Sequence, residues 1–134
     1  MSLNTKHIFI SHSWSHADAY YRLRKMLENR PYFDYKDYSV PKEDPIHYAG
    51  STGELERAIE NQIRKASVVL ILAGVYATHS KWIDKEIQIA QRLGKRIVAV
   101  EPWGSEKTSA IVKRSAHEIV KWQADSIVKA IRGY

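Results

Sequence analysis

The sequence has no cysteine among its 134 residues, so disulfide bonds, cysteine-ligated zinc and thiolate catalysis are excluded. Glycine and proline are scarce, with 6 and 4 residues, which is too few for a linker or a fibrous protein. The longest apolar run, 68–75, is far shorter than the roughly 20 residues that cross a bilayer. Residues 1–6 contain no apolar signal core. We therefore expect a cytoplasmic protein without a membrane partner.

Charge of one sign is not concentrated anywhere in the chain. Lys and Arg number 21 against 15 Asp and Glu, and the net charge of +6 favours anionic partners such as nucleotides. The basic residues are scattered among acidic ones, which argues against a nucleic-acid-binding surface. Hydrophobic residues make up 44% and charged residues 27%. With a length typical of one domain, the chain is expected to form a single globular domain over residues 1–134.

Strand-like and helix-like patterns alternate along the chain. Short apolar runs rich in β-branched residues predict strands at 7–11, 67–73 and 96–100, with weaker ones at 32–36 and 118–122. Apolar residues with helical spacing predict helices at 15–28, 51–63, 80–93 and 124–131, and Gly94 is expected to cap the third. Residues 37–53 read as a long irregular loop, and 108–117 have no clear pattern.

The alternation predicts an α/β fold, a flavodoxin-like three-layer sandwich with a central parallel five-stranded sheet and helices on both faces. In such sheets, ligands bind at the carboxyl ends of the strands, where the strand order reverses. We therefore expect the functional site in the segments that follow the strands, which are 11–16, 37–50, 74–80 and 101–105.

Several common occupants of this fold are not supported. A phosphorylated receiver needs acidic residues after its first and third strands, but 11–12 and 73–74 contain none. Bulky His12 and Trp14 disfavour a phosphate cradle for FMN. Neither a G-x-G-x-x-G nor a P-loop sequence occurs, so classical dinucleotide and nucleoside triphosphate sites are absent.

A metal site is also not expected. His12 and His16 are four residues apart, but the predicted helix begins between them, so they do not share a helical face. No paired acidic residue completes a ligand set around them.

Trp82 and Glu86 are four residues apart on the predicted helix 80–93 and share a face next to its apolar stripe. This spacing places a carboxylate near the core. A simpler interpretation is an exposed Glu86 at the edge of the stripe, paired with Lys85 or Arg92. The helix pattern alone leaves both interpretations open.

Five segments occur in an order and spacing that resemble a known superfamily. They are HIFISHSW (7–14), DYSVPKEDPI (37–46), VVLILAG (68–74), SKWIDKEI (80–87) and GKRIVAV (94–100). Together they resemble the Toll/interleukin-1 receptor (TIR) superfamily, and within it the bacterial TIR-like proteins typified by ThsB of the Thoeris antiphage defence system. The S-x-W-x-x-x-E element and the FIS run are the most specific parts of this resemblance.

The resemblance implies that Glu86 is the catalytic residue of an enzyme that cleaves NAD at the nicotinamide–ribose bond, an NAD nucleosidase or ADP-ribosyl cyclase. NAD is then a substrate, and no cofactor is implied. The implied product is an ADP-ribose-type, cyclic signalling nucleotide that a separate effector protein receives. One carboxylate suffices because nicotinamide leaves as a neutral molecule, whereas most glycosidases need two carboxyl groups.

Six further residues are predicted to bind the substrate: Ser11, His12, Trp14, Asp37, Tyr38 and Trp82. Ser11 and His12 are expected to donate hydrogen bonds to ribose or pyrophosphate. Trp14 or Tyr38 is expected to stack on a nicotinamide or adenine ring, and Asp37 to bound the pocket. The simpler interpretations are loop capping for the first pair and packing for the aromatic residues.

Two non-catalytic functions remain open. In one, the domain is an adaptor that binds a second copy or other TIR-like domains through residues 37–50, and Glu86 is structural. In the other, the protein senses NAD or a related nucleotide without cleaving it. The W-x-x-x-E element favours catalysis over both.

Overall fold

A computed structural model describes residues 5–11, 18–39, 52–72, 81–101 and 110–133. Strands and helices alternate through these ranges as β1 (Lys6–Ser11), α1 (Asp18–Glu28), β2 (Tyr35–Asp37), α3 (Thr52–Lys65), β3 (Val68–Leu72), α5 (Lys81–Arg92), β4 (Arg96–Val100), α6 (Ala110–Ser115), β5 (Glu118–Val120) and α7 (Ala124–Arg132). Within the described ranges, no helix has both the length and the apolar character needed to cross a membrane.

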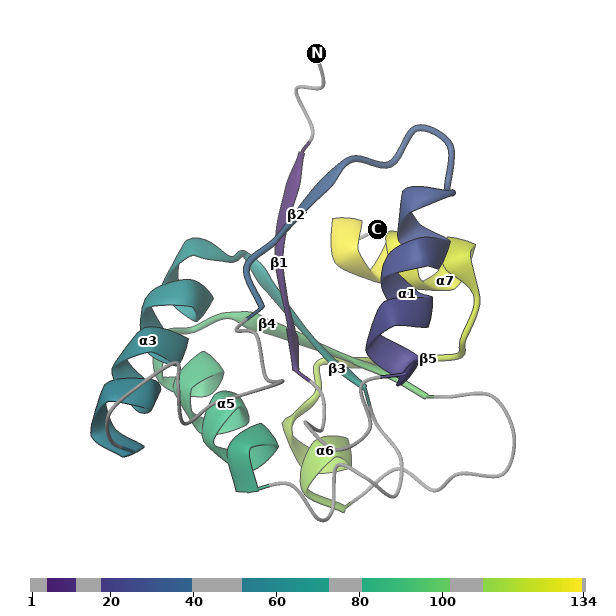
Figure 1. The fold of residues 1–134 in the computed structure, drawn as a ribbon. Helices are drawn as coiled ribbons and strands as arrows, with labels where there is room; N and C mark the ends of the chain where they lie inside the picture. Colours follow the sequence, from purple (N-terminus) through teal and green to yellow (C-terminus); the bar gives the residue numbers. More distant parts are fainter. Residues whose placement is uncertain (1–4, 12–17, 40–51, 73–80, 102–109, 134) are drawn as a thin grey trace.

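The five strands form one parallel sheet in the order β2-β1-β3-β4-β5 (Figure 1). This is the flavodoxin-like order, and the predicted fold class is confirmed. The chain moves outward from β1 to β2 and then returns to the other side of β1 to form β3. The strand order therefore reverses at β1, where Ser11 is in register with Ile71 of β3.

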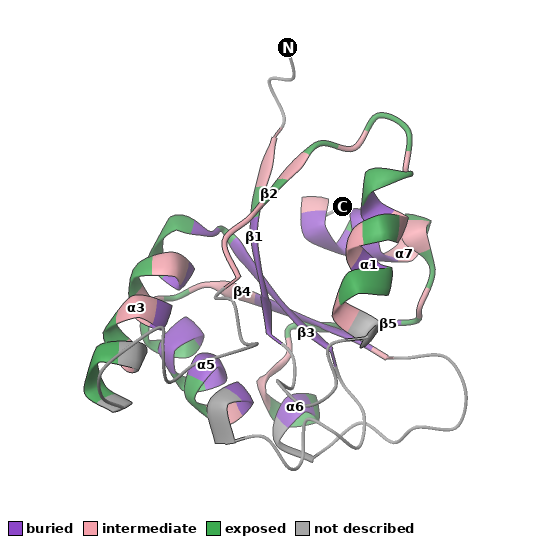
Figure 2. Cartoon of the chain, viewed as in Figure 1, coloured by how far each residue is buried: buried purple, intermediate pink, exposed green. Residues whose placement is uncertain are grey.

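Helices cover both faces of the sheet (Figure 1): α3, α5 and α6 lie on one face, and α1 and α7 lie on the other. Each face has its own hydrophobic core. Phe9, Val69 and Ile71 contribute to the core under α3 and α5, whereas Ile8 and Leu70 contribute to the core under α1 and α7. Because both faces are buried (Figure 2), the central strands read as continuous apolar runs in the sequence.

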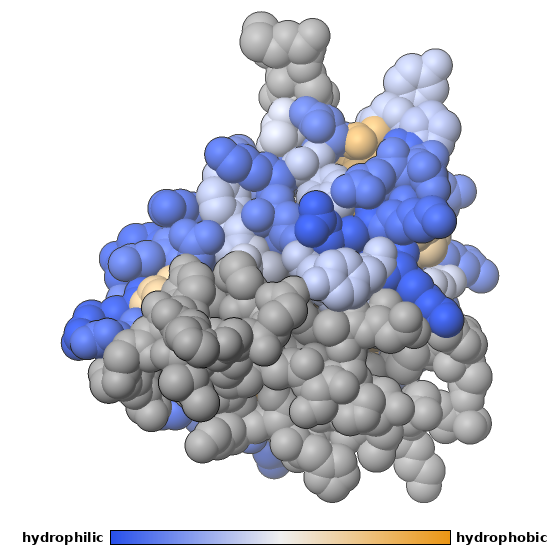
Figure 3. Space-filling view, viewed as in Figure 1, coloured by the Kyte–Doolittle hydropathy of each residue, from blue (hydrophilic) through white to orange (hydrophobic). Residues whose placement is uncertain are grey.

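The outer surface of the described residues is largely hydrophilic in the view of Figure 3, where apolar residues show only as small isolated patches. Large hydrophobic side chains that are exposed among the described residues are Tyr21, Tyr32 and Ile119. Most apolar side chains in the described part of the chain therefore lie in the two cores.

The edge strand β2 differs from its predicted position. It spans Tyr35–Asp37 rather than 32–36. Tyr32 has a φ of 61° and is 97% exposed, so a turn after Pro31 occupies the start of the predicted strand. At its other end the strand includes Asp37, which the sequence pattern assigned to a loop. The segment 108–117, which had no clear pattern, contains the short helix α6.

Gly94 ends α5, as predicted. Its φ of 69° is left-handed, and its N–H donates to the carbonyl of Gln91 at 3.1 Å. The N–H of Lys95 donates to the carbonyl of Ala90 at 2.9 Å. These two bonds form a Schellman motif, which satisfies the last carbonyls of the helix and turns the chain into β4.

Candidate active site

Ser11 and Glu86 meet at the carboxyl end of β1. The hydroxyl of Ser11 donates a hydrogen bond to Oε1 of Glu86, with an oxygen–oxygen distance of 2.6 Å. Both residues are 0% exposed. Among the described residues, they are the polar or charged ones that are buried. Burying a carboxylate is costly unless hydrogen bonds replace its contacts with water. The Ser11 hydroxyl therefore stabilises Glu86 in its buried position.

The local structure of β1 and α5 explains why these two side chains meet. In β1, Ser11 is two residues after Phe9 and points to the same face of the sheet, the face covered by α3 and α5. In α5, Glu86 is three residues after Ile83 and four before Ala90, and both of these pack in the core on that face. The apolar stripe of α5 therefore carries the carboxylate toward the sheet.

The interpretation of Glu86 as an exposed ion-pair partner is wrong, because its side chain is fully buried. The two cations considered for that role bind residues of α3 instead. Lys85 Nζ lies 2.8 Å from Oε1 of Glu56, and Arg92 pairs with Glu60. These ion pairs join the outer sides of α3 and α5, whereas Glu86 faces the sheet.

Asp37 lies on the opposite face of the sheet from Glu86, against α1. Its Oδ2 accepts a hydrogen bond from the hydroxyl of Tyr20 at 2.6 Å, and Nε of Arg24 lies 3.7 Å from the same oxygen. Its Oδ1 accepts hydrogen bonds from the N–H of Ser39, at 2.8 Å, and from the Ser39 hydroxyl. Asp37 therefore organises the junction of α1 and the edge strand.

Ser39 was not singled out in the sequence, yet it connects this network to β1. Its hydroxyl oxygen accepts a hydrogen bond from the N–H of Ile10 at 2.9 Å while its proton goes to Asp37. The chain of hydrogen bonds from Tyr20 through Asp37 and Ser39 thus ends at the residue before Ser11. The Asp-x-Ser spacing, which is typical of a turn closed by an Asp side chain, is the signal that could have identified Ser39.

Two tyrosines of this region have altered acidity. Burial and the hydrogen bond to the carboxylate of Asp37 raise the pKa of Tyr20. Burial also raises the pKa of Tyr35, whose hydroxyl donates to the carbonyl of Arg24 at 3.4 Å. Both phenols therefore stay protonated to a higher pH than an ordinary tyrosine, and Tyr20 remains a donor to Asp37 over that range.

Tyr38 lies on the α3 and α5 face but is directed away from Ser11 and Glu86. Its ring stacks on that of His7, with 5.6 Å between centroids, and its hydroxyl lies 2.9 Å from His7 Nδ1. The ammonium of Lys36 lies 5.4 Å from the centre of the Tyr38 ring. His7 is four residues before Ser11 in β1, which is roughly 13 Å along a strand. The structure therefore does not bring Tyr38 to the Ser11–Glu86 pair.

The side chains of the other three predicted site residues lie outside the described part of the structure. Trp82 is in the first turn of α5, one turn before Glu86, but its side chain is outside the described part of the structure, as are His12 and Trp14. A substrate-binding role for all six residues stays a prediction. Among described side chains, no group of three His, Cys, Asp or Glu is arranged to hold a metal ion, and both His12 and His16 lie outside that set.

Comparisons with known proteins identify a matching family model and solved structures with a similar fold. A family model described as "Thoeris protein ThsB, TIR-like domain" matches residues 9–107, which include every predicted site residue. No curated protein matches the chain in sequence. The structure of the CMP N-glycosidase BcmB of Clostridium botulinum is similar with a TM-score of 0.57 and 14% identity, over 96% of this chain and 100% of that one.

A 2-desoxiribosyltransferase from Leishmania mexicana is also similar, with a TM-score of 0.51 and 16% identity. The match covers 72% of this chain and 64% of the transferase. At these identities the two solved structures establish a shared fold.

Proposed function

The chain belongs to the family of TIR-like domains of the Thoeris protein ThsB, and we propose that it cleaves NAD at the nicotinamide–ribose bond with Glu86 as the catalytic carboxylate. The observation that carries this proposal is the burial of Glu86 against Ser11 at the carboxyl end of β1. This position is next to the point where the strand order reverses, which is where ligands bind in such sheets. The product is ADP-ribose or a cyclic isomer of it, which acts as a signal for a separate effector in antiviral defence.

The two solved structures with the same fold support a reaction at a ribose. One is named as an N-glycosidase of CMP and the other as a desoxiribosyltransferase, so both names refer to a ribosyl or deoxyribosyl group. Because one fold hosts many activities, this support is weaker than that from the family and from Glu86 itself.

The chemistry of NAD requires little more than a well-placed carboxylate. The bond between ribose C1′ and the cationic nicotinamide nitrogen breaks, and its electron pair goes to the ring nitrogen, so that neutral nicotinamide leaves without a general acid. The positive charge that develops on the ribose is stabilised by the negative charge of Glu86. A water molecule then forms a bond to C1′ and releases a proton, which gives ADP-ribose. Attack by the adenine or a ribose hydroxyl of the same molecule gives a cyclic isomer.

Ser11 acts as a positioning residue in this proposal. Its hydrogen bond to Oε1 holds the carboxylate of Glu86 in one orientation beneath the end of β1. A buried carboxylate acts in a medium of low dielectric, where its effect on a developing charge is larger than in water. The burial that makes Glu86 effective also covers it, since the residue is 0% exposed. Activity therefore requires a rearrangement that uncovers Glu86, and association of copies at high concentration is the proposed trigger.

The test is to incubate the purified protein with NAD at low and high protein concentration and to separate nicotinamide, ADP-ribose and cyclic isomers by mass-resolved chromatography. Glu86→Gln is expected to abolish nicotinamide release with a nearly unchanged melting temperature. Glu56→Gln is the matched control, because it makes the same change at a carboxylate that pairs with Lys85 on the outer side of α3. The control is expected to keep full activity.

The products distinguish the alternatives. Nicotinamide with ADP-ribose indicates a hydrolase, and nicotinamide with a cyclic isomer indicates a cyclase. Equal nicotinamide release by wild type and Glu86→Gln would overturn the assignment of Glu86. If no concentration of wild type releases nicotinamide, the cleavage proposal is wrong for the isolated protein, and the adaptor or sensor function replaces it.

A further inference from the structure

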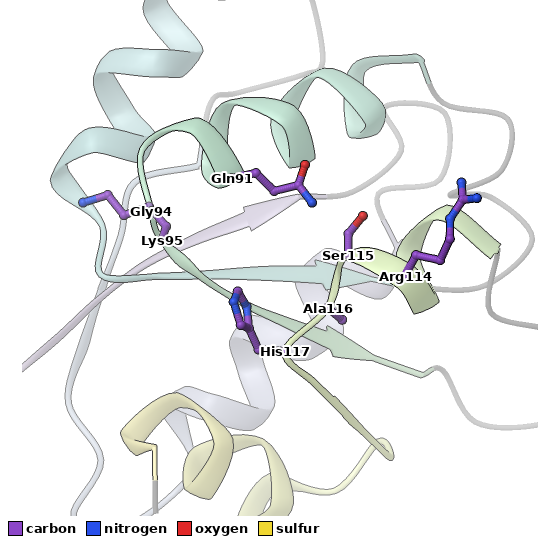
Figure 4. Close-up of a pocket in the computed structure, with 7 residues that line it drawn as sticks. All are labelled: Gln91, Gly94, Lys95, Arg114, Ser115, Ala116 and His117. Atoms are coloured by element: carbon purple, nitrogen blue, oxygen red, sulfur yellow. The ribbon is translucent and has the colours of Figure 1, made fainter.

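A cavity separate from the Ser11–Glu86 pair lies between the end of α5 and the segment that joins α6 to β5 (Figure 4). Its volume is about 380 Å³, and its lining residues are Gln91, Gly94, Lys95, Arg114, Ser115, Ala116 and His117. Pockets for small molecules usually have volumes of roughly 300–1,000 Å³. The cavity lies where the chain enters β4 and β5, at the amino ends of these strands. This is the end of the sheet opposite the carboxyl end of β1.

The lining residues provide hydrogen-bond donors and positive charge but no carboxylate. The side chains of Gln91, Arg114 and Ser115 make no hydrogen bond or ion pair with any residue in the described ranges. In Figure 4, Gln91 extends from α5 and the Ser115 hydroxyl points toward it, while Arg114 extends outward from α6 on the other side of Ser115. An amide, a guanidinium and a hydroxyl from two helices are thus available to one ligand.

His117 adds a donor whose tautomer is set by the backbone. Its Nδ1 accepts a hydrogen bond from the backbone N–H of Ile97 at 3.0 Å, and the backbone N–H of His117 donates to the carbonyl of Ile97 at 2.8 Å. Because Nδ1 is an acceptor, the proton of the neutral ring is on Nε2. The ring is held between β4 and β5, and its free edge can offer Nε2–H to a bound oxygen.

Lys95 contributes charge at the rim of the cavity. Its ammonium donates to the carbonyl of Arg64 at 3.1 Å, which fixes it at the end of α3 rather than inside the cavity. Arg114 is therefore the cation that can contact a ligand directly. A guanidinium beside several neutral donors matches the oxygens of a phosphoryl group, which accept several hydrogen bonds and carry negative charge.

We propose that this cavity binds the phosphoryl group of a small ligand no larger than a mononucleotide. Arg114 pairs with the phosphoryl oxygens, and Gln91 and Ser115 donate hydrogen bonds to them. His117 lies across the cavity from Arg114 in Figure 4, and its Nε2 donates to the rest of the ligand. The site is distinct from the Ser11–Glu86 pair and does not depend on NAD cleavage. Inorganic phosphate and a mononucleotide carry the same group, so the experiment compares the two.

The test is a titration of the ¹⁵N-labelled full chain, followed by amide chemical shifts, with inorganic phosphate, with AMP and with adenosine at constant ionic strength. Saturable shifts of Gly94, Ser115 and His117 with phosphate or AMP, and none with adenosine, are expected. Tighter binding of AMP identifies a nucleotide as the ligand, and equal binding identifies phosphate itself; both support a phosphoryl site.

Two variants separate the site from general charge attraction. Arg114→Ala is expected to weaken binding by about tenfold or more, because it removes the charge-assisted hydrogen bonds. Lys113→Ala removes the same charge from the exposed neighbouring position, which does not line the cavity, and is expected to change affinity less than about twofold. Equal weakening in both variants, binding of adenosine as tight as that of AMP, or no saturable shift with either phosphate or AMP would overturn the proposal.

Discussion

The hydroxyl of Ser11 donates a 2.6 Å hydrogen bond to the carboxylate of Glu86 across a separation of 75 positions in the sequence. The distance is within the range of a charge-assisted hydrogen bond between a hydroxyl and a carboxylate. Both residues are buried, so this bond replaces part of the hydration that the carboxylate loses on folding. It also joins β1 to α5, which makes the position of Glu86 dependent on the packing of the whole α5 face.

Replacing Ser11 by alanine is expected to lower the free energy of unfolding by about 1–3 kcal/mol, because the buried carboxylate loses a donor. Urea denaturation followed by circular dichroism measures the change. The control is Ser67→Ala, which removes a hydroxyl that donates to the carbonyl of His7 at 3.2 Å in an exposed position. It is expected to change the same free energy by less than about 0.5 kcal/mol. Equal losses in the two variants would contradict a special role for the Ser11 hydroxyl.

Replacing Ser39 by alanine is expected to speed hydrogen exchange of the Ile10 amide by about three- to tenfold, because the hydrogen bond from that N–H to the Ser39 hydroxyl is removed. Exchange measured by NMR on the folded protein reads this bond directly. Ser39→Thr keeps a hydroxyl at the same position and is expected to restore slow exchange. Unchanged exchange in Ser39→Ala would show that the Ser39 hydroxyl does not protect Ile10.

The free energy of unfolding is expected to fall above about pH 10 because of Tyr20 and Tyr35. The pKa of both phenols is raised in the folded state from the ordinary value of 10.0. The contribution of these two phenols to the free energy of unfolding is complete below pH 10. It is lost as the pH rises toward their folded-state pKa, because the unfolded chain releases these protons first. Urea denaturation between pH 9 and 11 measures the decline.

The phenylalanine variants test this assignment. Tyr20→Phe and Tyr35→Phe are each expected to flatten the decline, and the double variant is expected to flatten it most. A decline of the same slope in the double variant would show that other groups cause it. Absorbance at 295 nm follows the ionisation of the 8 tyrosines together as the pH rises. In the double variant, the part of the increase that occurs at the highest pH is expected to disappear.

Gly94→Ala is expected to destabilise the protein by about 1–2 kcal/mol, because a residue with a Cβ is strained at a φ of 69°. No atom beyond Gly94 and its two neighbours in the chain lies within 4 Å of the added Cβ, so the cost is one of backbone conformation rather than of collision. Gly94→Asn is expected to lose less, since asparagine tolerates the left-handed conformation. The exposed Gly53, in the first turn of α3, is the control. Gly53→Ala is expected not to lower the melting temperature, and a fall similar to that of Gly94→Ala would contradict the conformational explanation.

The parts of the fold with a strong hydrophobic pattern could be predicted from the sequence, and the edge of the sheet could not. β3 is apolar at every position and is buried at every position, so its place in the centre of the sheet follows from its composition. β2 has three residues, none of them fully buried, and a preceding turn at Tyr32 that no local pattern indicated. A short edge strand is held by the neighbouring strand rather than by its own periodicity.

The candidate site, too, could be predicted from the sequence only in part. The spacing of α5 and the W-x-x-x-E element pointed to Glu86, but they could not show that Ser11 is its partner. Asp37 and Tyr38 were both predicted to face one pocket because they were assigned to a loop. Asp37 is instead the last residue of β2 and faces α1, and Tyr38 lies on the other side of the sheet against His7. Successive residues at the end of a strand point to opposite faces, so one of the two had to turn away.

The sequence by itself determined which side of each helix and strand faces inward, since the periods of 3.6 and 2 residues are properties of the backbone. It therefore determined the parallel sheet and the two covering layers, whereas the helix pattern left open whether Glu86 is buried or exposed. Only the tertiary structure decided which side chains meet, because the register of β1 against β3 and the placement of α5 on that face depend on the packing of the whole core. For that reason the Ser11–Glu86 bond, the link from Ser39 to Ile10 and the cavity beside Arg114 appear only when the chain is folded.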